Sequence, residues 1–313
     1  MSSVNASTSD HSSSSDYEAL SRLSWTDANG TVWRGWETKP RGLPVILFRH
    51  ANGFATGTYR SLLQPLLREY DLVAWEIPGT GESETGSVSP GWDSCAAEAA
   101  AQLQALSEAR PGVPIIGMGH SFGGMCSLLS AAAKPGLYSG LILLDPVIQP
   151  PLMSRLTHWG GRLGLTRKMP LVQGTLKRRR AWPSKTDAED RLRGKGIFKG
   201  WKDGFLSDYV HYNLKAEGDQ QVLCYPPEYE AHLFSNYTRR LWPSMARLVT
   251  PTCIIAGEDT YSFIHQSLRV IGRRYPQIEC QVVTGGHCFP MQYPDDTLNR
   301  IRTQLAHMLG ASS

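Results

Sequence analysis

Several features are scarce in this sequence, and each scarcity excludes a class of protein. Only 19% of the 313 residues are charged and 41% are hydrophobic, which excludes whole-chain disorder, collagen and coiled coil. The six cysteines form no Cys-x-x-Cys pair, which argues against a disulfide framework and a zinc site. No apolar run approaches the ~18 residues of a membrane span. We therefore expect no metal, no cofactor and no membrane partner.

The two ends of the sequence bear on location. The first 15 residues contain eight serines and no apolar run, which predicts a disordered tail over residues 1–19 rather than a signal peptide. The last four residues, Gly310-Ala311-Ser312-Ser313, lack a Ser-Lys-Leu peroxisomal address. With the unpaired cysteines, these ends predict a cytoplasmic protein.

Short apolar runs alternate with segments of helical spacing along most of the chain. This alternation predicts an α/β fold in which a mostly parallel sheet is covered on both faces. Before it, Asn29-Gly30 lies between two alternating runs, which predicts a hairpin with a type I′ turn. The expected strands of the sheet are Pro44–Phe48, Leu72–Trp75, Val113–Met118, Leu141–Leu144, Thr252–Ala256 and Glu279–Val283. The expected helices are Tyr59–Glu69, Trp92–Ala109, Phe122–Ala133, Ser262–Tyr275 and Asp296–Leu309.

Residues 146–248 interrupt the alternation. This segment is far too long for a simple loop, and its apolar residues recur at helical spacing. It holds 18 Lys and Arg against 9 Asp and Glu, whereas the whole chain holds 32 against 28. We therefore expect a catalytic core over residues 20–145 and 249–313, with a basic, helical lid inserted at 146–248 after the sixth strand.

A G-x-S-x-G pattern centred on Ser121 lies between a predicted strand and a predicted helix. The pattern alone is weak, because glycine and serine are common in this chain. In this context, however, the glycines allow a sharp strand-to-helix turn that exposes the serine hydroxyl at the end of the sheet. The positive end of the helix dipole also favours an anion there. The alternative is a glycine-rich turn with a capping serine.

The segment Phe48–Phe54 (FRHANGF) follows the expected third strand, where a second oxyanion donor is needed. The backbone amides of Asn52 and Phe122 are therefore the candidate oxyanion-hole donors. His50 in the same segment is a candidate binding residue. We expect it to brace the loop through hydrogen bonds rather than to transfer protons.

These motifs resemble the α/β-hydrolase superfamily from about residue 20 to the C-terminus. The order is HANGF, then IPGTGES at Ile77–Ser83, then GHSFGG at the elbow. GHSFGG, Leu141–Gln149 (LILLDPVIQ) and Ala181–Ser184 (AWPS) are similar to a branch of fungal toxin- and polyketide-pathway hydrolases that includes acyl-CoA hydrolases. Bacterial relatives of that branch share FxHANGF and a piece like Arg193–Trp201. The resemblance implies the α/β-hydrolase fold and a place in specialised metabolism.

The order Ser…Asp…His points to the remaining catalytic groups. His287 follows the last predicted strand and is the candidate general base. Two aspartates compete for the role of orienting acid. Asp259 stands at the common superfamily position, whereas the resembled branch uses the acid of the LLDP motif, here Asp145. We favour Asp145 as the orienting acid, keep Asp259 as the main alternative and rank Glu258 third. The aspartate that is not the acid is expected to cap a helix or to pair with the lid.

These residues predict a serine hydrolase of carboxylic esters or acyl thioesters, possibly acyl-CoA. The basic run Lys177, Arg178, Arg179 and Arg180 is a candidate subsite for an anionic leaving group, with a solvated helical face as the alternative. No aromatic stacking pattern accompanies the run, so nucleic acid is not expected as a partner. The partner is a small molecule, and the sequence leaves the oligomeric state open. A serine-dependent lyase, an acyltransferase or a non-catalytic binding homologue remain alternatives.

Overall fold

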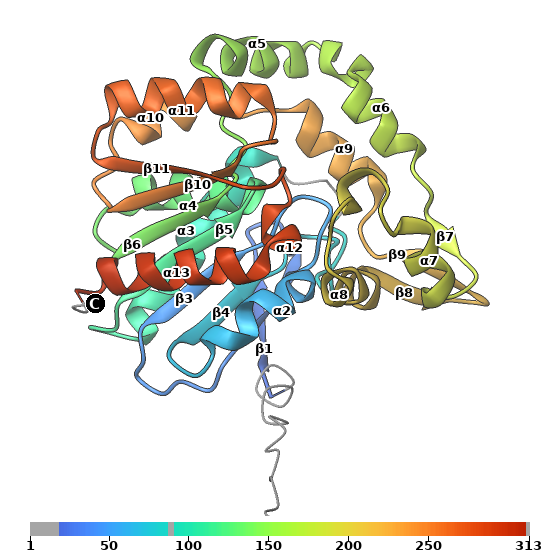
Figure 1. Cartoon of the computed structure of the whole chain (residues 1–313), viewed down its shortest axis with the longest axis horizontal. Coiled ribbons are helices and arrows are strands. Elements are labelled where there is room, and N and C mark those ends of the chain that lie inside the picture. Colours follow the sequence, from blue (N-terminus) through green and yellow to red (C-terminus); the bar gives the residue numbers. More distant parts are fainter. Residues whose placement is uncertain (1–18, 87–90, 311–313) are drawn as a thin grey trace, which may run out of the picture.

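A computed structural model describes residues 19–86 and 91–310 of the chain. An eight-stranded sheet carries helices on both faces, and the insert, residues 146–248, packs against this core (Figure 1). The α/β class and the mostly parallel sheet are thereby confirmed. Apart from residue 19, the predicted serine-rich tail lies outside the described residues.

The sheet has the strand order β1-β2-β4-β3-β5-β6-β10-β11. The β1–β2 and β2–β4 pairs are antiparallel, and every other neighbouring pair is parallel. Its strands are β1 Ser21–Thr26, β2 Val32–Glu37, β3 Val45–Arg49, β4 Asp71–Trp75, β5 Ile115–His120, β6 Gly140–Leu144, β10 Thr252–Gly257 and β11 Ile278–Val283. Since β3, β5, β6 and β10 are parallel neighbours, their carboxyl ends lie together at one edge of the sheet.

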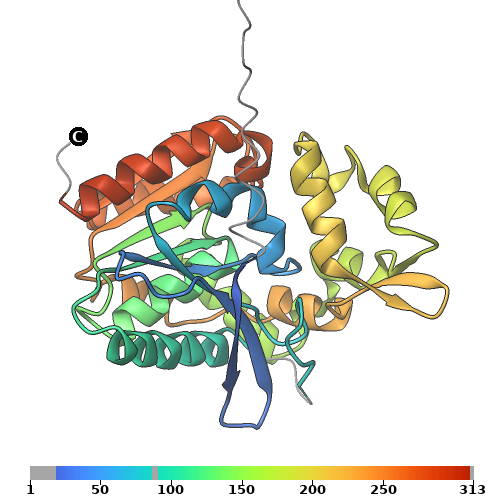
Figure 2. The ribbon, with the colours of Figure 1, turned by 90° about the horizontal axis from the view of Figure 1, so that it is seen from below.

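Side chains along each central strand point alternately to the two faces of the sheet and pack into two separate hydrophobic clusters, one on each face. On β3, Val45 and Leu47 pack into one cluster, whereas Ile46 and Phe48 pack into the other. The first cluster includes α3 Trp92–Ala109, α4 Phe122–Ala133, α10 Leu241–Met245 and α11 Ser262–Arg274. The second includes α2 Arg60–Leu63, α12 Phe289–Gln292 and α13 Pro294–Met308. Figure 2 shows α3 (teal) and α13 (red) on opposite faces of the sheet.

The predicted helix over Tyr59–Glu69 is shorter and broken. The chain forms a 3₁₀ turn η1 at Thr56–Tyr59, then α2, then a second turn η2 at Gln64–Leu66. Pro65 lies in η2 and has no backbone N–H to continue the α-helical ladder, which explains the early end of α2.

The hairpin between β1 and β2 is present, but its turn is not type I′. That turn needs two residues with positive φ, and in this loop only Gly30 has one, at 79°. Asp27 organises the loop, because its carboxylate accepts from the backbone N–H groups of Asn29 and Thr31 at 2.8 and 3.0 Å.

The insert is mostly helical, as expected, but it also contains a small antiparallel sheet that helical spacing did not predict. This sheet has the order β7-β9-β8. Its hairpin turns at Gly218-Asp219, a two-residue glycine signal that could have revealed it. The elements of the insert are α5 Pro151–Arg162, η3 Leu165–Lys168, α6 Pro170–Lys177, β7 Ala181–Trp182, α7 Lys185–Leu192, η4 Gly196–Phe198, α8 Asp203–Asn213, β8 Leu214–Glu217, β9 Gln220–Leu223, α9 Pro227–Ser235 and α10.

The insert and the core share hydrophobic clusters. Aromatic side chains of the insert, such as Phe198 and Tyr209, belong to the cluster that contains Phe48 and Phe54 of the core. At the end of the insert, Leu241 and Met245 of α10 belong to the opposite cluster, and α10 packs against α4. The aromatic residues of the insert therefore pack against the catalytic core. They do not form a separate hydrophobic core within the insert.

Two helical glycines offer a matched test of this packing. A Cβ on Gly123 at the start of α4 would lie 2.1 Å from the backbone oxygen of Arg49, whereas a Cβ on Gly272 in α11 would meet nothing within 4 Å. We expect Gly123→Ala to lower the free energy of unfolding by more than about 3 kcal/mol, because backbone must move. Gly272→Ala is expected to raise it by about 0.5–1 kcal/mol. Urea unfolding monitored by circular dichroism measures both; similar values for the two variants would contradict this packing.

Candidate active site

Ser121 stands at the sharp turn between β5 and α4. Its backbone has φ 56° and ψ −116°, a conformation that non-glycine residues rarely adopt. The turn is tight because a Cβ on Gly119 would lie 2.5 Å from the carbonyl carbon of Gly123. The Ser121 N–H donates to the carbonyl of Leu144 on β6 at 2.8 Å, which anchors the turn to the neighbouring strand. The predicted strand–turn–helix context of the serine is thus present.

Ser121, His287 and Asp145 form one chain of hydrogen bonds. The Ser121 Oγ lies 2.9 Å from His287 Nε2, and His287 Nδ1 lies 2.6 Å from Asp145 Oδ2. These residues come from the ends of three elements: the β5–α4 turn, the loop after β11 and the end of β6. Asp145 is fully buried, so its interaction with the imidazole is little screened by water.

Asp145 is held by its backbone and by three donors. Its φ is 42°, and Ser121 and Asp145 are the only non-glycine residues with positive φ in the described part of the chain. The carboxylate accepts from the Gly257 N–H at 2.8 Å and from the Thr260 hydroxyl, besides its bond with His287. Strained backbone of this kind is typical of functional sites.

Neither alternative acid contacts His287, although Asp259 lines the cavity beside it. The side chains of Asp259 and Glu258 are exposed and have no hydrogen-bond partner among residues 19–86 and 91–310. Asp259 contributes only its backbone N–H, which donates to the Gly285 carbonyl at 2.9 Å and so holds the loop that carries His287. The geometry therefore favours Asp145 over both competitors.

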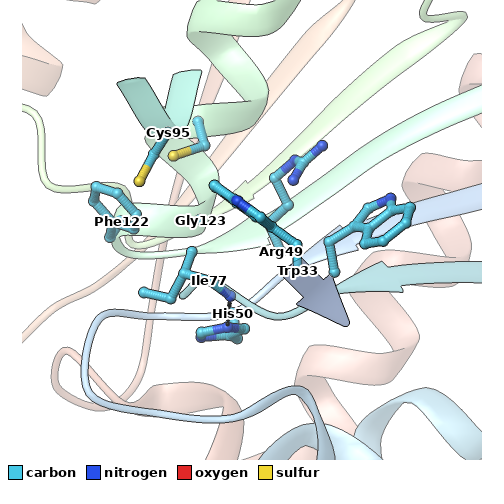
Figure 3. Close-up of a pocket in the computed structure, with 9 residues that line it drawn as sticks. Trp33, Arg49, His50, Ile77, Cys95, Phe122 and Gly123 are labelled. Atoms are coloured by element: carbon cyan, nitrogen blue, oxygen red, sulfur yellow. Dashed lines mark hydrogen bonds between the residues drawn. The ribbon is translucent and has the colours of Figure 1, made fainter. Parts of the chain in front are cut away.

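The loop after β3, residues 50–54, lies against the start of α4, and we call it the β3 loop. The Asn52 N–H donates to no other group in the described part of the chain. The Phe122 N–H is in the first turn of α4, where a helix leaves its amides without internal partners. Figure 3 shows Phe122 and Gly123 close to Arg49 and His50, around a cavity of only about 10 Å³. This space fits about one water, so it is no substrate pocket.

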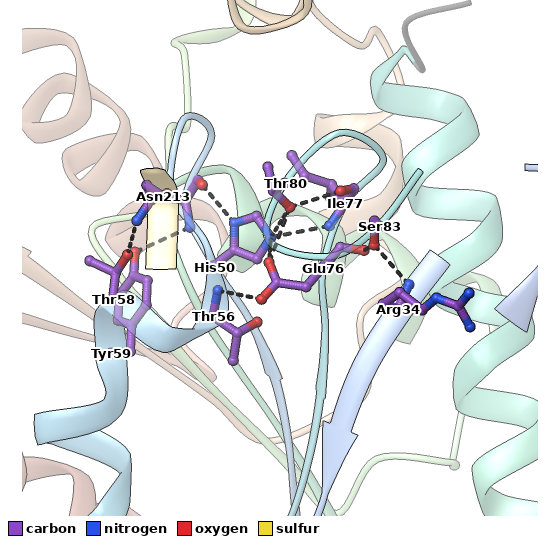
Figure 4. Close-up of polar contacts among 11 residues, drawn as sticks. Arg34, His50, Thr56, Thr58, Tyr59, Glu76, Ile77, Thr80, Ser83 and Asn213 are labelled. Carbon is purple, nitrogen blue, oxygen red and sulfur yellow. Dashed lines mark hydrogen bonds and ion pairs between the residues drawn. The ribbon is translucent and has the colours of Figure 1, made fainter. Parts of the chain in front are cut away.

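His50 braces the β3 loop, in line with the expectation for it, and is therefore not a substrate-binding residue. Its side chain is 1% exposed, and both ring nitrogens already have protein partners (Figure 4). Nδ1 donates to the Ala51 carbonyl at 2.8 Å, while Nε2 accepts from the Ile77 N–H at 3.1 Å. Glu76 is also 3.2 Å from Nε2, and its other oxygen accepts from the Thr56 N–H. No ring nitrogen of His50 is left for a substrate.

A second buried histidine, His120, connects the β3 loop to His287. The Tyr59 hydroxyl accepts from the Ala51 N–H at 3.1 Å, so its own proton is donated to His120 Nδ1 at 2.7 Å. His120 Nε2 therefore carries the ring proton, which it donates to the His287 carbonyl at 2.8 Å. Burial lowers the pKa of His120 to about 3, so it stays neutral beside His287.

Sequence reasoning gave His120 no role because it occupies the variable position of the elbow motif. Its partner Tyr59 lies 61 residues away, so no local pattern joins the two side chains.

Cys288, the neighbour of His287, is also buried, but its thiol takes no part in this hydrogen-bond chain. Burial, followed by the charge of Asp145, raises the pKa of its thiol to about 12, which keeps it protonated and unreactive.

Most of the predicted basic subsite is engaged within the protein. Arg178 pairs with Glu230 at 2.5 Å, and Arg180 pairs with Glu228 at 2.5 Å. Arg179 donates to the Ala181 carbonyl at 2.8 Å and lies over the Trp182 ring. Lys177 is exposed and has no partner in the described part of the chain. The run is therefore neither a free anion subsite nor a purely solvated face.

The Arg178–Glu230 pair reaches the β3 loop. The backbone carbonyl of Glu230 accepts from the Asn52 side-chain amide at 3.1 Å. A Cβ on Gly53 would lie 2.6 Å from Glu230 Oε1, so the carboxylate lies directly against this loop. An ion pair within the insert thus supports the segment that carries the Asn52 amide.

A larger cavity, of about 310 Å³, opens beside His287. Its wall comes from the insert on one side and from the core loops after β10 and β11 on the other. Ile197 and Lys199 contribute from the insert, and the Tyr261 ring lies 5.1 Å from the His287 ring. The volume suits a small organic molecule.

The described residues offer neither a metal-binding cluster nor a membrane-spanning helix. Within residues 19–86 and 91–310, no three His, Cys, Asp or Glu side chains cluster in a way that could hold a metal ion. Over the same ranges, no helix combines the length and apolar character required to cross a bilayer.

Curated relatives match part of the chain. The abhydrolase domain-containing protein AKT2 of Alternaria alternata is 32% identical over 155 residues, which is 49% of this chain and 52% of the relative. Human monoglyceride lipase is 30% identical over 136 residues, 42% of this chain and 44% of the relative. The chain thus spans about half the length of these relatives, and the fungal match agrees with the predicted branch.

Solved structures match nearly the whole fold. An E-2-(acetamidomethylene)succinate hydrolase aligns with a TM-score of 0.70 at 17% identity, covering 93% of this chain and 100% of the other. A thioesterase domain from the curacin biosynthetic pathway aligns with a TM-score of 0.72 at 16% identity, covering 90% and 99%. The sequence model of the alpha/beta hydrolase family matches residues 45–300. The chain is therefore a member of the alpha/beta hydrolase family.

Proposed function

We propose that this protein is a serine hydrolase that cleaves a carboxylic ester or acyl thioester through an acyl-enzyme. The observation that carries the proposal is the continuous chain from the Ser121 Oγ through His287 to Asp145, with contacts of 2.9 and 2.6 Å. A serine hydroxyl is a weak nucleophile by itself, and an adjacent base held by a carboxylate activates it.

In the proposed first half-reaction, His287 Nε2 removes the Ser121 proton while Oγ forms a bond to the substrate carbonyl carbon. The Asn52 and Phe122 amides donate to the oxygen that becomes negative. Asp145 stabilises the imidazolium and keeps Nδ1 protonated. The carbonyl then re-forms, the bond to the leaving group breaks, and His287 protonates that group.

In the second half-reaction, His287 removes a proton from water, and the hydroxide bonds to the acyl carbon. Collapse of this second oxyanion breaks the ester to Ser121, which regains its proton from His287. No other co-reactant is needed, because water supplies both the hydroxyl group and the proton. The cavity of about 310 Å³ is lined by His287 and not by Ser121, so it is the candidate space for the leaving group that His287 protonates.

An oxygen ester is better supported than acyl-CoA. Human monoglyceride lipase, similar over part of its length, is named for a glyceride ester. Recognition of an anionic leaving group would use the basic run, but Arg178 and Arg180 are paired with glutamates inside the insert. A role in specialised metabolism and a cytoplasmic location stay predictions. A lyase, an acyltransferase and a non-catalytic binding protein stay the alternative functions.

A three-variant series tests the chemistry on p-nitrophenyl esters of short and medium chain length. We expect Ser121→Ala to lower kcat to background. Asp145→Asn is expected to lower kcat by ~10⁴, because an amide stabilises the wrong tautomer of His287. Asp259→Asn is the matched control and leaves kcat near that of the unmodified protein, because its carboxylate contacts no catalytic group. Equal, small losses at both aspartates would refute the assignment, and Ser121-independent turnover would refute the hydrolase.

Tyr59 and His120 are expected to position the β3 loop relative to His287. Tyr59→Phe keeps the buried ring but removes the hydroxyl that joins Ala51 to His120. We expect kcat to fall about 10- to 100-fold with KM nearly unchanged, because small displacements of reacting groups are costly.

The control is Tyr138→Phe, which removes a buried hydroxyl from the opposite hydrophobic cluster, where it contacts Ser130 at 3.4 Å. Its kcat is expected to stay unchanged. Steady-state kinetics measures kcat and KM, and urea unfolding measures the stability of both variants. Equal losses of kcat in Tyr59→Phe and Tyr138→Phe would mean that the Tyr59 hydroxyl only stabilises the fold.

A further inference from the structure

Helix α5 exposes its apolar side and buries its polar side, which is the reverse of the usual arrangement. Leu152, Leu156, Trp159 and Leu163 recur at the spacing of one helix face and are 67%, 64%, 55% and 72% exposed. Leu165 and Leu171, 66% and 47% exposed, extend this row toward α6. We call these six residues the apolar stripe.

The buried side of α5 is held by polar contacts. Ser154 and Thr157 face inward, and the Ser154 hydroxyl donates to the Thr238 carbonyl at 3.4 Å. His158 Nδ1 donates to the Tyr237 carbonyl at 2.8 Å. A Cβ on Gly161 would lie 2.5 Å from the Ser235 carbonyl oxygen, so the helix packs closely there. These contacts fix the rotation of α5, so the exposure of the apolar stripe is a property of the fold.

The stripe lies on the outside of the molecule. Figure 1 shows α5 at the top of the ribbon, followed by α6 along the same outer rim. The leucines and Trp159, spread over about three turns of helix and the segment that follows, form an apolar surface that water hydrates poorly. Contiguous exposed apolar patches of this kind mark interaction sites in soluble proteins.

The segment that carries the stripe has charge of one sign, and the nearby Asp93, which shares a recess with Arg162, is paired with Arg240. From residue 146 to residue 186 the sequence contains no Asp or Glu, but it contains nine Lys and Arg. Arg162 lies 5.8 Å from the Trp159 ring centroid, within the stripe itself. Beside the stripe, Arg155 and Arg239 line a recess of about 280 Å³, and no acidic residue lines it. The partner must therefore offer both apolar volume and negative charge.

We propose that the apolar stripe docks on the surface of an anionic lipid bilayer, with the leucines and Trp159 in the headgroup region and the arginines on phosphates. A bilayer accepts a convex row of leucines, whereas a protein partner would need a matching groove. A second copy of this chain would bring the same basic residues face to face, which opposes self-association. Lys and Arg near an anionic surface add attraction that salt weakens.

This docking departs from the expectation of no membrane partner, which rested only on the lack of an apolar run long enough to span a bilayer. A helix that lies in the plane of the interface needs one apolar face and a basic border, and no apolar run of ~18 residues. The proposal does not depend on the chemistry at Ser121, because α5 carries none of the proposed catalytic groups.

Vesicle co-sedimentation of the Ser121→Ala protein tests the proposal without catalysis. The probes are phosphatidylcholine vesicles with and without about one third phosphatidylserine, at low and at raised ionic strength. We expect binding to the phosphatidylserine vesicles that weakens with salt. The double variant Leu156→Gln/Leu163→Gln is expected to bind at least about tenfold more weakly, because two leucines no longer enter the interface.

The matched control is Val249→Gln, which removes an apolar side chain that is 73% exposed outside the stripe. It is expected to bind vesicles like the parent protein. Absence of vesicle binding, or equal binding by the double variant, would overturn the proposal. A dimer in light scattering that the double variant converts to monomer would also overturn it, in favour of an interface between copies of the chain.

Discussion

The geometry of the site depends on one close contact, between the first turn of α4 and the backbone of the β3 loop. A side chain on Gly123 would overlap the carbonyl oxygens of Arg49 and His50, at 2.1 and 2.5 Å from its Cβ. Because only hydrogen occupies this position, the two segments approach closely, which places the Asn52 and Phe122 amides where we propose that they serve one oxyanion. The turn at Ser121 depends on a second close contact of the same helix start, because a Cβ on Gly119 would lie 2.5 Å from the carbonyl carbon of Gly123. Close backbone packing at Gly123 thus positions both Ser121 and the proposed stabilising donors.

Buried polar side chains maintain this arrangement from three sides. His50 ties the β3 loop to the end of β4, and Tyr59 with His120 ties it to the His287 loop. From the insert, the Glu230 carbonyl accepts from the Asn52 amide group, while Arg178 neutralises the nearby carboxylate. Removing one partner from such a buried contact costs the desolvation of the polar group left behind, so these contacts are expected to hold the segments in place. The insert is therefore part of the support of the candidate active site.

The sequence allowed most of the core to be predicted, and the failures have identifiable causes. Helices α3 and α4 occur where the spacing placed them, because apolar periodicity and a local turn signal agree there. The preference for Asp145 over Asp259 came from the resemblance at the LLDP motif and agrees with the structure. The residues alone left that choice open, because both aspartates follow buried strands and only the turn at Asp145, with φ 42°, brings its carboxylate to His287. The partners of the basic run could not be seen either, since Glu228 and Glu230 lie about 50 residues away along the chain. The β8–β9 hairpin was missed because its signal is one Gly-Asp pair within a segment of helical spacing.

Direct detection of the acyl-enzyme tests the central claim, that Ser121 is the nucleophile of an acyl-transfer reaction. The protein is mixed with p-nitrophenyl acetate, quenched in acid within the first turnovers, digested and mapped by mass spectrometry. The account predicts a rapid release of p-nitrophenol equal to the enzyme concentration and an acetyl group on the peptide that contains Ser121, because deacylation needs a second attack by water. Turnover without an acetylated Ser121, or an acetyl group on Cys288 instead, would contradict it.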